Sequence, residues 1–194
     1  MFVDLSTREV SLAVQWTGSE LNKTQGACEP LSIFEMQKIK NPYAGMEDQG
    51  YFCFACCPSN PYGLKMEFFE DGDDIVCYWK TRPEYQSWIN TLHGGIQATL
   101  LDEIGGWVVH RKLQKAGMTT SLNMKYRRPT PVGEGVVLEL RARIKEIKKS
   151  FAFIEATLSH EGQVCSQCEM IYYCFSQEKS ASEFGFNGCE LEQE

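Results

Sequence analysis

The chain has 194 residues, 43% of them hydrophobic, which is enough to bury the core of one compact domain. Its formal net charge of −7 argues against nucleic acid as the main partner, because no excess of Lys and Arg is present to neutralise phosphates. No run of 18 apolar residues and no signal-like apolar stretch is visible, so we expect a cytoplasmic protein whose nine cysteines are reduced thiols.

The start of the chain differs from the rest. Residues 1–35 hold a weak alternating stretch and then polar residues, with no pattern that continues into the next segment, which indicates a flexible or accessory N-terminal extension. We expect the main domain to cover residues 36–178. Residues 179–194 are acidic and are predicted to form a solvated or disordered tail.

Within the domain, the first ordered elements are short. Residues 53–63 are dense in Pro, Asn, Ser and Gly, which predicts a loop. Residues 64–70 and 75–80 are rich in β-forming side chains and flank an Asp-Gly turn, so they are predicted to pair as a hairpin.

A long helix is predicted over residues 93–117. Its apolar side chains fall on nearly every side, which is typical of a buried helix. After residue 117 the apolar residues recur with period two, which predicts a meander of antiparallel strands with one buried face. These strands are expected over 118–128, 136–148, 151–160 and 164–175.

This order of elements predicts an α+β architecture. A sheet of about six antiparallel strands cannot hide its apolar face alone, and one helix is available to cover it. We therefore expect the sheet to wrap around the single long central helix.

Asp102 lies in the middle of the apolar part of that helix. Burying an ionised carboxylate costs several kcal/mol unless the carboxylate is paired or its pKa rises, so a functional role is one explanation. A structural role is the other, with Asp102 on an exposed stripe or paired with a strand Arg or Lys. The helix pattern alone does not separate these two explanations.

Glycines at the start of the helix point to a second functional group. His93-Gly94-Gly95 comes after Asn90 and Thr91, either of which could cap the helix, and the free N–H groups there can stabilise a developing negative charge. Gly94 and Asp102 are separated by about 12 Å of helical rise. One chain therefore cannot apply both groups to one carbonyl, so either two chains share the site or Asp102 is structural.

Three segments resemble a known family. HGGIQATLLDE (93–103) resembles the signature of the hotdog-fold acyl-CoA thioesterases, in the branch of the phenylacetate-pathway and 4-hydroxybenzoyl-CoA enzymes. TTSLNMKYRRPTPVGE (119–134) and CFACCPSNPYGL (53–64) resemble other stretches of these proteins. The resemblance covers roughly residues 50–175. His-Gly-Gly alone is a weak signal, but with the spaced Asp and the downstream turn it is fairly specific.

The resemblance implies hydrolysis of acyl-CoA or aroyl-CoA thioesters in a homodimer or homotetramer, with sites across the dimer interface. Asp102 then matches the general base or nucleophile, and the Gly94 N–H matches the donor that polarises the thioester carbonyl across that interface. Thr119 matches a position that orients the attacking water. No cofactor is implied beyond the coenzyme A of the substrate.

The resemblance also implies supporting residues. Gln86 or Ser87 stands where relatives hold water or substrate with an Asn or Gln, and Gln86 has the better chemistry. His93 and Gly95 border the substrate at the helix start, where His93 orients the loop, and Thr120 neighbours Thr119. Apart from the resemblance, the local cations that could bind the phosphates of coenzyme A are Arg127, Arg128, Lys148 and Lys149, of which we select Arg127 and Arg128.

Other functions compete with this hypothesis. A non-catalytic acyl-CoA binder would need no catalytic carboxylate, and a hotdog hydratase or dehydratase would pair Asp102 with a nearby histidine, for which only His110 is available. Glu103 is expected to face a dimer partner or a charged pair. The Cys53-x-x-Cys56 loop invites a zinc or redox interpretation, with Cys165 and Cys168 as remote further ligands, but it supplies only a partial set. We therefore expect no metal.

Overall fold

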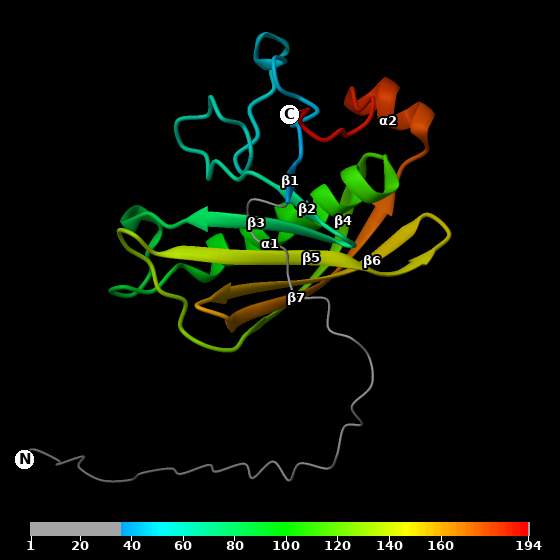
Figure 1. Cartoon of the computed structure of the whole chain (residues 1–194). Coiled ribbons are helices and arrows are strands. Elements are labelled where there is room, and N and C mark those ends of the chain that lie inside the picture. The colour runs from blue at the N-terminus through cyan, green and yellow to red at the C-terminus, as the bar shows by residue number, and fades with distance from the viewer. Residues whose placement is uncertain (1–35, 194) are drawn as a thin grey trace, which may run out of the picture.

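The computed structural model describes residues 36–193, so the extension predicted over residues 1–35 lies outside the described part. Two α-helices, a π-helical turn and seven strands make up most of this part (Figure 1). The strands are β1 (Gln37–Lys38), β2 (Phe69–Asp71), β3 (Asp74–Lys80), β4 (Gly117–Tyr126), β5 (Val137–Lys148), β6 (Phe151–His160) and β7 (Gln163–Cys174). The helices are α1 (Gly94–Val108) and α2 (Gln177–Phe184), with short 3-10 turns η1 (Glu47–Gln49) and η2 (Pro83–Tyr85) and the π-helical turn η3 (Val109–Leu113).

The strands form one antiparallel sheet in the order β1-β2-β3-β5-β6-β7-β4, and this sheet curves around α1 (Figure 1). The predicted architecture is confirmed, with seven strands in place of about six. Helix α1 is buried as expected, because Leu100, Leu101, Ile104 and Trp107 all lie in the core. Among residues 36–193, no helix is long and apolar enough to cross a membrane.

The predicted elements differ from the structure in two boundaries and in the pairing of one strand. The hairpin forms with Asp71 opposite Asp74, but its first strand starts only at Phe69. The central helix was predicted to reach residue 117, but its α-helical part ends at Val108. A π-helical turn follows, and Gln114, in a left-handed conformation, ends it. The prediction of a four-strand meander is wrong for the first of the four strands.

The strand β4 lies at the far edge of the sheet. Strands β5, β6 and β7 form the expected meander, but β4 pairs with β7 and has no neighbour on its other side among the described residues. Because β3 already pairs with one edge of β5 and β6 with the other, β4 cannot lie beside β5. Residues 127–136, which include Pro129 and Pro131, carry the chain from this edge back to the middle of the sheet.

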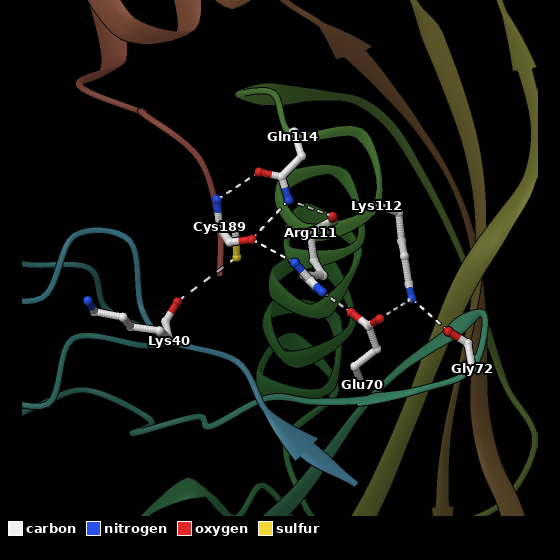
Figure 2. Close-up of polar contacts among 7 residues, drawn as sticks. All are labelled: Lys40, Glu70, Gly72, Arg111, Lys112, Gln114 and Cys189. Carbon is white, nitrogen blue, oxygen red and sulfur yellow. Dashed lines mark hydrogen bonds and ion pairs between the residues drawn. The ribbon is translucent and has the colours of Figure 1, made fainter. Parts of the chain in front are cut away.

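The C-terminal segment is ordered, so the prediction of a solvated tail from residue 179 is wrong. Phe186 and Cys189 are buried. The backbone N–H of Cys189 donates a 2.9 Å hydrogen bond to the side-chain oxygen of Gln114 (Figure 2). The backbone carbonyl of Cys189 accepts 2.9 Å bonds from the side-chain nitrogen of Gln114 and from the guanidinium of Arg111. The Arg111 guanidinium also bonds the carboxylate of Glu70 in β2. The hydrogen bonds of the Cys189 backbone, together with the burial of Phe186 and Cys189, anchor this segment to the end of the central helix.

Gly105 allows α1 to approach β7 closely. A Cβ added at Gly105 would lie 2.9 Å from the hydroxyl of Tyr172 and from the side chain of Met170, whereas one added at Gly106 would meet its nearest atom at 3.9 Å. The pair Gly105-Gly106 is therefore a packing feature, as its place in a buried helix suggests.

We expect Gly105→Ala to lower the free energy of unfolding by about 1–3 kcal/mol, because the added methyl group overpacks the contact with β7. Gly106→Ala is the matched control. It should raise stability by about 0.5–1 kcal/mol, since alanine has the higher helix propensity and the site has room. Urea denaturation of both variants measures the difference, and equal stability changes at the two positions would contradict the packing role of Gly105.

Candidate functional site at the central helix

The start of α1 is organised by His93. Its Nδ1 accepts a 2.9 Å hydrogen bond from the N–H of Gly95, so His93 itself caps the helix in place of Asn90 or Thr91. This bond occupies the imidazole nitrogen that would act as a base and leaves the proton on Nε2. This geometry fits the loop-orienting role that the resemblance implies for His93 better than a role as catalytic base.

The N–H of Gly94 is open to a ligand. No acceptor for it is recorded among residues 36–193, and it lies at the positive end of the helix dipole. The carbonyl of Gly94 accepts a 2.9 Å bond from the hydroxyl of Tyr126 in β4. Gln97, for which no role was predicted, anchors the same turn by bonding the Leu92 carbonyl at 3.1 Å and the Thr130 hydroxyl at 3.0 Å.

The carboxylate of Asp102 is held by two hydroxyls. Oδ1 accepts a 2.7 Å bond from Thr119 and a 3.0 Å bond from Tyr172, whose hydroxyl also bonds the Asp102 carbonyl. Oδ2 has no hydrogen-bond partner in the described part of the chain and is not among its enclosed unpaired atoms. No cation within residues 36–193 forms an ion pair with Asp102, so the structural alternative of pairing with a strand Arg or Lys finds no support.

The register of β4 and β7 explains this arrangement. Thr119 is directly opposite Tyr172 across the two strands, so both side chains point to the same face of the sheet, toward α1. A bulge between Thr119 and Ser121 shifts the register at Thr120, and bulges often redirect side chains beside active sites. The site thus uses neighbouring residues of two strands that are far apart in the sequence.

Tyr172 is a site residue that was not predicted from the sequence. It lies on the buried face of β7, where the alternation of that strand places it, and a hydroxyl on this face needs a partner. Burial is the largest cause that raises its pKa, and the charge of Asp102 raises the pKa further. The phenol therefore stays protonated and donates a hydrogen bond to Asp102.

Gly94 and Asp102 lie on the same uninterrupted helix. Eight residues of α-helix place them about 12 Å apart. This agrees with the prediction that one chain cannot bring both groups to one carbonyl.

The remaining predicted residues lie around the helix start and the edge strand. Ser87 bonds the Thr91 carbonyl through its N–H at 2.8 Å and its hydroxyl at 3.3 Å, and Thr120 bonds the Ile171 carbonyl at 2.9 Å. Both hydroxyls are thus occupied by backbone. Gln86 is exposed beside Leu92, with no side-chain hydrogen bond recorded within residues 36–193. Arg127 and Arg128 are exposed just past Tyr126 and bond glutamines of β7.

Glu103 has no charged partner within residues 36–193, and its predicted contact with a dimer partner stays a prediction. Its Oε1 accepts a 3.0 Å bond from the indole of Trp107, and the Cys53 thiol lies 3.8 Å from Oε1 and 3.9 Å from Oε2. Burial, as the largest cause, raises the pKa of Glu103 to about 7. A hydrogen bond with the thiol of Cys56 is the largest cause that lowers the pKa of Cys53 to about 5, and the same bond raises the pKa of Cys56.

Comparison with known proteins gives consistent findings. Residues 89–174 match the profile of the Thioesterase superfamily. Human acyl-coenzyme A thioesterase 13 is 31% identical over 88 residues, which make up 45% of this chain and 61% of that protein. A thioesterase superfamily protein from Shewanella loihica has a TM-score of 0.51 and 29% identity, covering 61% of this chain and 96% of that one. A hypothetical thioesterase from Streptococcus pneumoniae, solved with coenzyme A, has a TM-score of 0.50 and 18% identity. The match covers 54% of this chain and 82% of that one. The chain thus spans about three fifths of the human relative's length.

Proposed function

We propose that this chain is a hotdog-fold member of the thioesterase superfamily and that it hydrolyses acyl-CoA or aroyl-CoA thioesters to the free acid and coenzyme A, which the match of residues 89–174 to that family supports. The observation that carries this proposal is the geometry of Asp102, a carboxylate on the central helix with Oδ1 held by two hydroxyls and Oδ2 free of protein partners within residues 36–193. This arrangement fixes the direction of the carboxylate and leaves Oδ2 available to accept a proton or a hydrogen bond from a ligand.

The proposed mechanism assigns a role to each group. The thioester carbonyl accepts a hydrogen bond from the N–H of Gly94, which stabilises the negative charge that develops on the oxygen. Oδ2 of Asp102 takes a proton from the attacking water, while Thr119 and Tyr172 fix the carboxylate. Collapse of the tetrahedral intermediate breaks the C–S bond and releases the thiolate of coenzyme A. Attack by Asp102 itself is the alternative route, and it would leave an acyl group on the enzyme.

The proposed site is shared between two copies of the chain. Edge strand β4 carries Thr119 and leaves ten residues without a partner on one side, as far as residues 36–193 are concerned, and such an edge invites pairing with another strand. Trp88 and Ile89, just before the helix start, are 81% and 86% exposed. A second copy that covers these surfaces could bring its Gly94 to Asp102 of the first, as a dimer or within a tetramer.

Other residues have proposed roles in substrate binding. Arg127 and Arg128 lie at the end of β4, near the strand residue that contacts Gly94, and we assign them to the phosphates of coenzyme A. Gln86 is free to hold water or substrate. We place the activity in the cytoplasm, because every described cysteine is a free thiol, as a reducing compartment requires.

A thiol-release assay over a panel of acyl- and aroyl-CoA esters tests the function. Hydrolysis of at least one class by the full chain is expected. Binding of these esters without hydrolysis would favour the non-catalytic binder. The hydratase alternative is weaker, because the ring of His110 is enclosed by Trp107, Tyr43 and Phe186 at the far end of the helix.

A mixed dimer tests the shared site. Asp102→Asn and Gly94→Pro are carried on separately tagged chains, and tandem purification selects dimers that contain one of each. If the site joins two chains, one of the two sites in each mixed dimer is intact, and about half of the wild-type rate per dimer is expected. A site within one chain predicts no recovery, because every site then lacks one group.

A further inference from the structure

The loop before the hairpin and the central helix place three metal-binding side chains together. The thiols of Cys53 and Cys56 and the carboxylate of Glu103 have donor atoms that all lie within 4.8 Å of one another. Two of these residues come from a Cys-x-x-Cys loop, and the third lies 50 positions later on α1. Only cysteines were expected as partners of this loop, so the carboxylate is a new member of the cluster.

The spacing of Cys53 and Glu103 is close to what a small tetrahedral ion requires. Zinc binds sulfur at about 2.3 Å and carboxylate oxygen at about 2.0–2.2 Å, so adjacent donors around it are about 3.5–3.8 Å apart. Cys53 Sγ lies 3.8 Å and 3.9 Å from the two oxygens of Glu103. Cys53 and Glu103 need to move by only a few tenths of an ångström to share one ion, and Cys56 Sγ lies within 4.8 Å of both.

The donor atoms are also oriented by outer hydrogen bonds, as metal ligands usually are. The N–H of Ala55 donates to Cys53 Sγ at 3.3 Å, and the hydroxyl of Tyr51 lies 3.2 Å from Cys56 Sγ. The indole of Trp107 donates to Oε1 of Glu103 at 3.0 Å. Each of the three ligands therefore has a neighbour that fixes its direction.

The cluster lacks a compensating cation among the described residues. No ion pair between Glu103 and a Lys or Arg is recorded within residues 36–193, although Glu103 is partly buried. If both thiols and the carboxylate were ionised, three negative charges would lie within 4.8 Å of one another, and a divalent ion would neutralise most of that charge. Cys56 and Trp107 also line a cavity of about 880 Å³, which offers an ion a path to the cluster.

We propose that Cys53, Cys56 and Glu103 bind one zinc ion, with water as the fourth ligand. Thiolate and carboxylate ligands in a four-coordinate arrangement suit zinc better than calcium or magnesium, which prefer oxygen ligands alone. The ion fastens the loop over residues 53–56 to the central helix, one residue after Asp102. This site departs from the expectation that the chain binds no metal.

Metal content and cobalt spectra of the full chain test the site. Protein purified under reducing conditions without chelators should contain about one zinc per chain. Cobalt added to the chelator-treated protein should give thiolate-to-cobalt charge-transfer absorption and the intense visible bands of a tetrahedral ion. Neither readout depends on thioester hydrolysis, so the failure of one proposal is distinguishable from the failure of the other.

Variants localise the ligands. The double variant Cys53→Ser, Cys56→Ser should lose the zinc and the charge-transfer band, and Glu103→Gln should weaken zinc binding by about tenfold or more while keeping the band. Cys57→Ala is the matched control from the same loop, since its thiol contacts Ser59 and the Tyr51 carbonyl and lies outside the cluster. Absence of zinc and of a cobalt spectrum in the folded wild-type protein overturns the proposal, as does full zinc content in the double variant.

Discussion

Asp102→Asn should lower the rate of thioester hydrolysis about 10²–10⁴-fold while acyl-CoA binding stays nearly unchanged, because the substitution removes a general base and little else. The asparagine oxygen can still accept the hydrogen bonds from Thr119 and Tyr172. The amide nitrogen that replaces Oδ2 cannot take a proton from water. Thiol release at saturating substrate measures the rate, and equilibrium binding of the same ester measures affinity.

Glu169→Gln is the matched control for this variant. It is the same carboxylate-to-amide change on an exposed residue of β7 that pairs with Lys145 at 2.8 Å, and it should leave the rate within about twofold of wild type. Asp102→Asn at full rate would show that Asp102 is structural. An acyl-enzyme trapped by rapid quenching of the wild type would replace the general-base role with direct attack.

Gly94→Pro should lower kcat about 10²–10³-fold, because it removes the proposed hydrogen-bond donor to the developing oxyanion. Proline is tolerated at the first position of a helix, where its missing N–H has no partner within the helix. The preceding residue His93 already has φ −59° and ψ 134°, which is the extended conformation that proline requires of its neighbour. The substitution is therefore expected to spare the fold.

Gly94→Ala distinguishes the loss of the N–H donor from the effect of added side-chain volume at this position. It keeps the N–H, and its Cβ would meet the ring of Tyr126 at 3.4 Å, which is an ordinary contact. We expect a rate within a few-fold of wild type, measured by thiol release, with circular dichroism to confirm that both variants are folded. Similar losses in the proline and alanine variants would point to crowding beside Tyr126 and would exclude the proposed donor.

The sequence predicts those features that depend on local patterns. Period-two alternation located β5, β6 and β7 to within about two residues, and the apolar surface of α1 predicted its burial. The position of β4 at the sheet edge could not be predicted this way. Strand order depends on which edge is vacant once β3 has paired with β5, and that is a property of the whole sheet.

The site was likewise predictable only where its residues belong to one continuous segment of the sequence. Asp102 and Thr119 belong to continuous motifs that the sequence displays, whereas the contact of Thr119 with Asp102 and the cap at His93 were not predicted. Tyr172 joins them only through the pairing of β4 with β7. The contact of Cys53 with Glu103 depends on how the 51–64 loop packs on α1, and no spacing rule links residues so far apart.

The bulge in β4 adds one residue between two residues of this strand that contact the site. They are therefore further apart in the sequence of β4 than their partners are in the sequence of β7. Thr119, which holds Asp102, and Tyr126, which holds Gly94, are seven positions apart, whereas their partners Tyr172 and Ser166 on β7 are six apart. Strict alternation counted back from Tyr126 would therefore predict that Thr120, and not Thr119, points toward α1. Deletion of Thr120 would remove the bulge, and Thr119 would still lie opposite Tyr172 and Tyr126 opposite Ser166. A relative whose strand is one residue shorter could thus hold the same two contacts, and an alignment without a gap at this point would miss the correspondence.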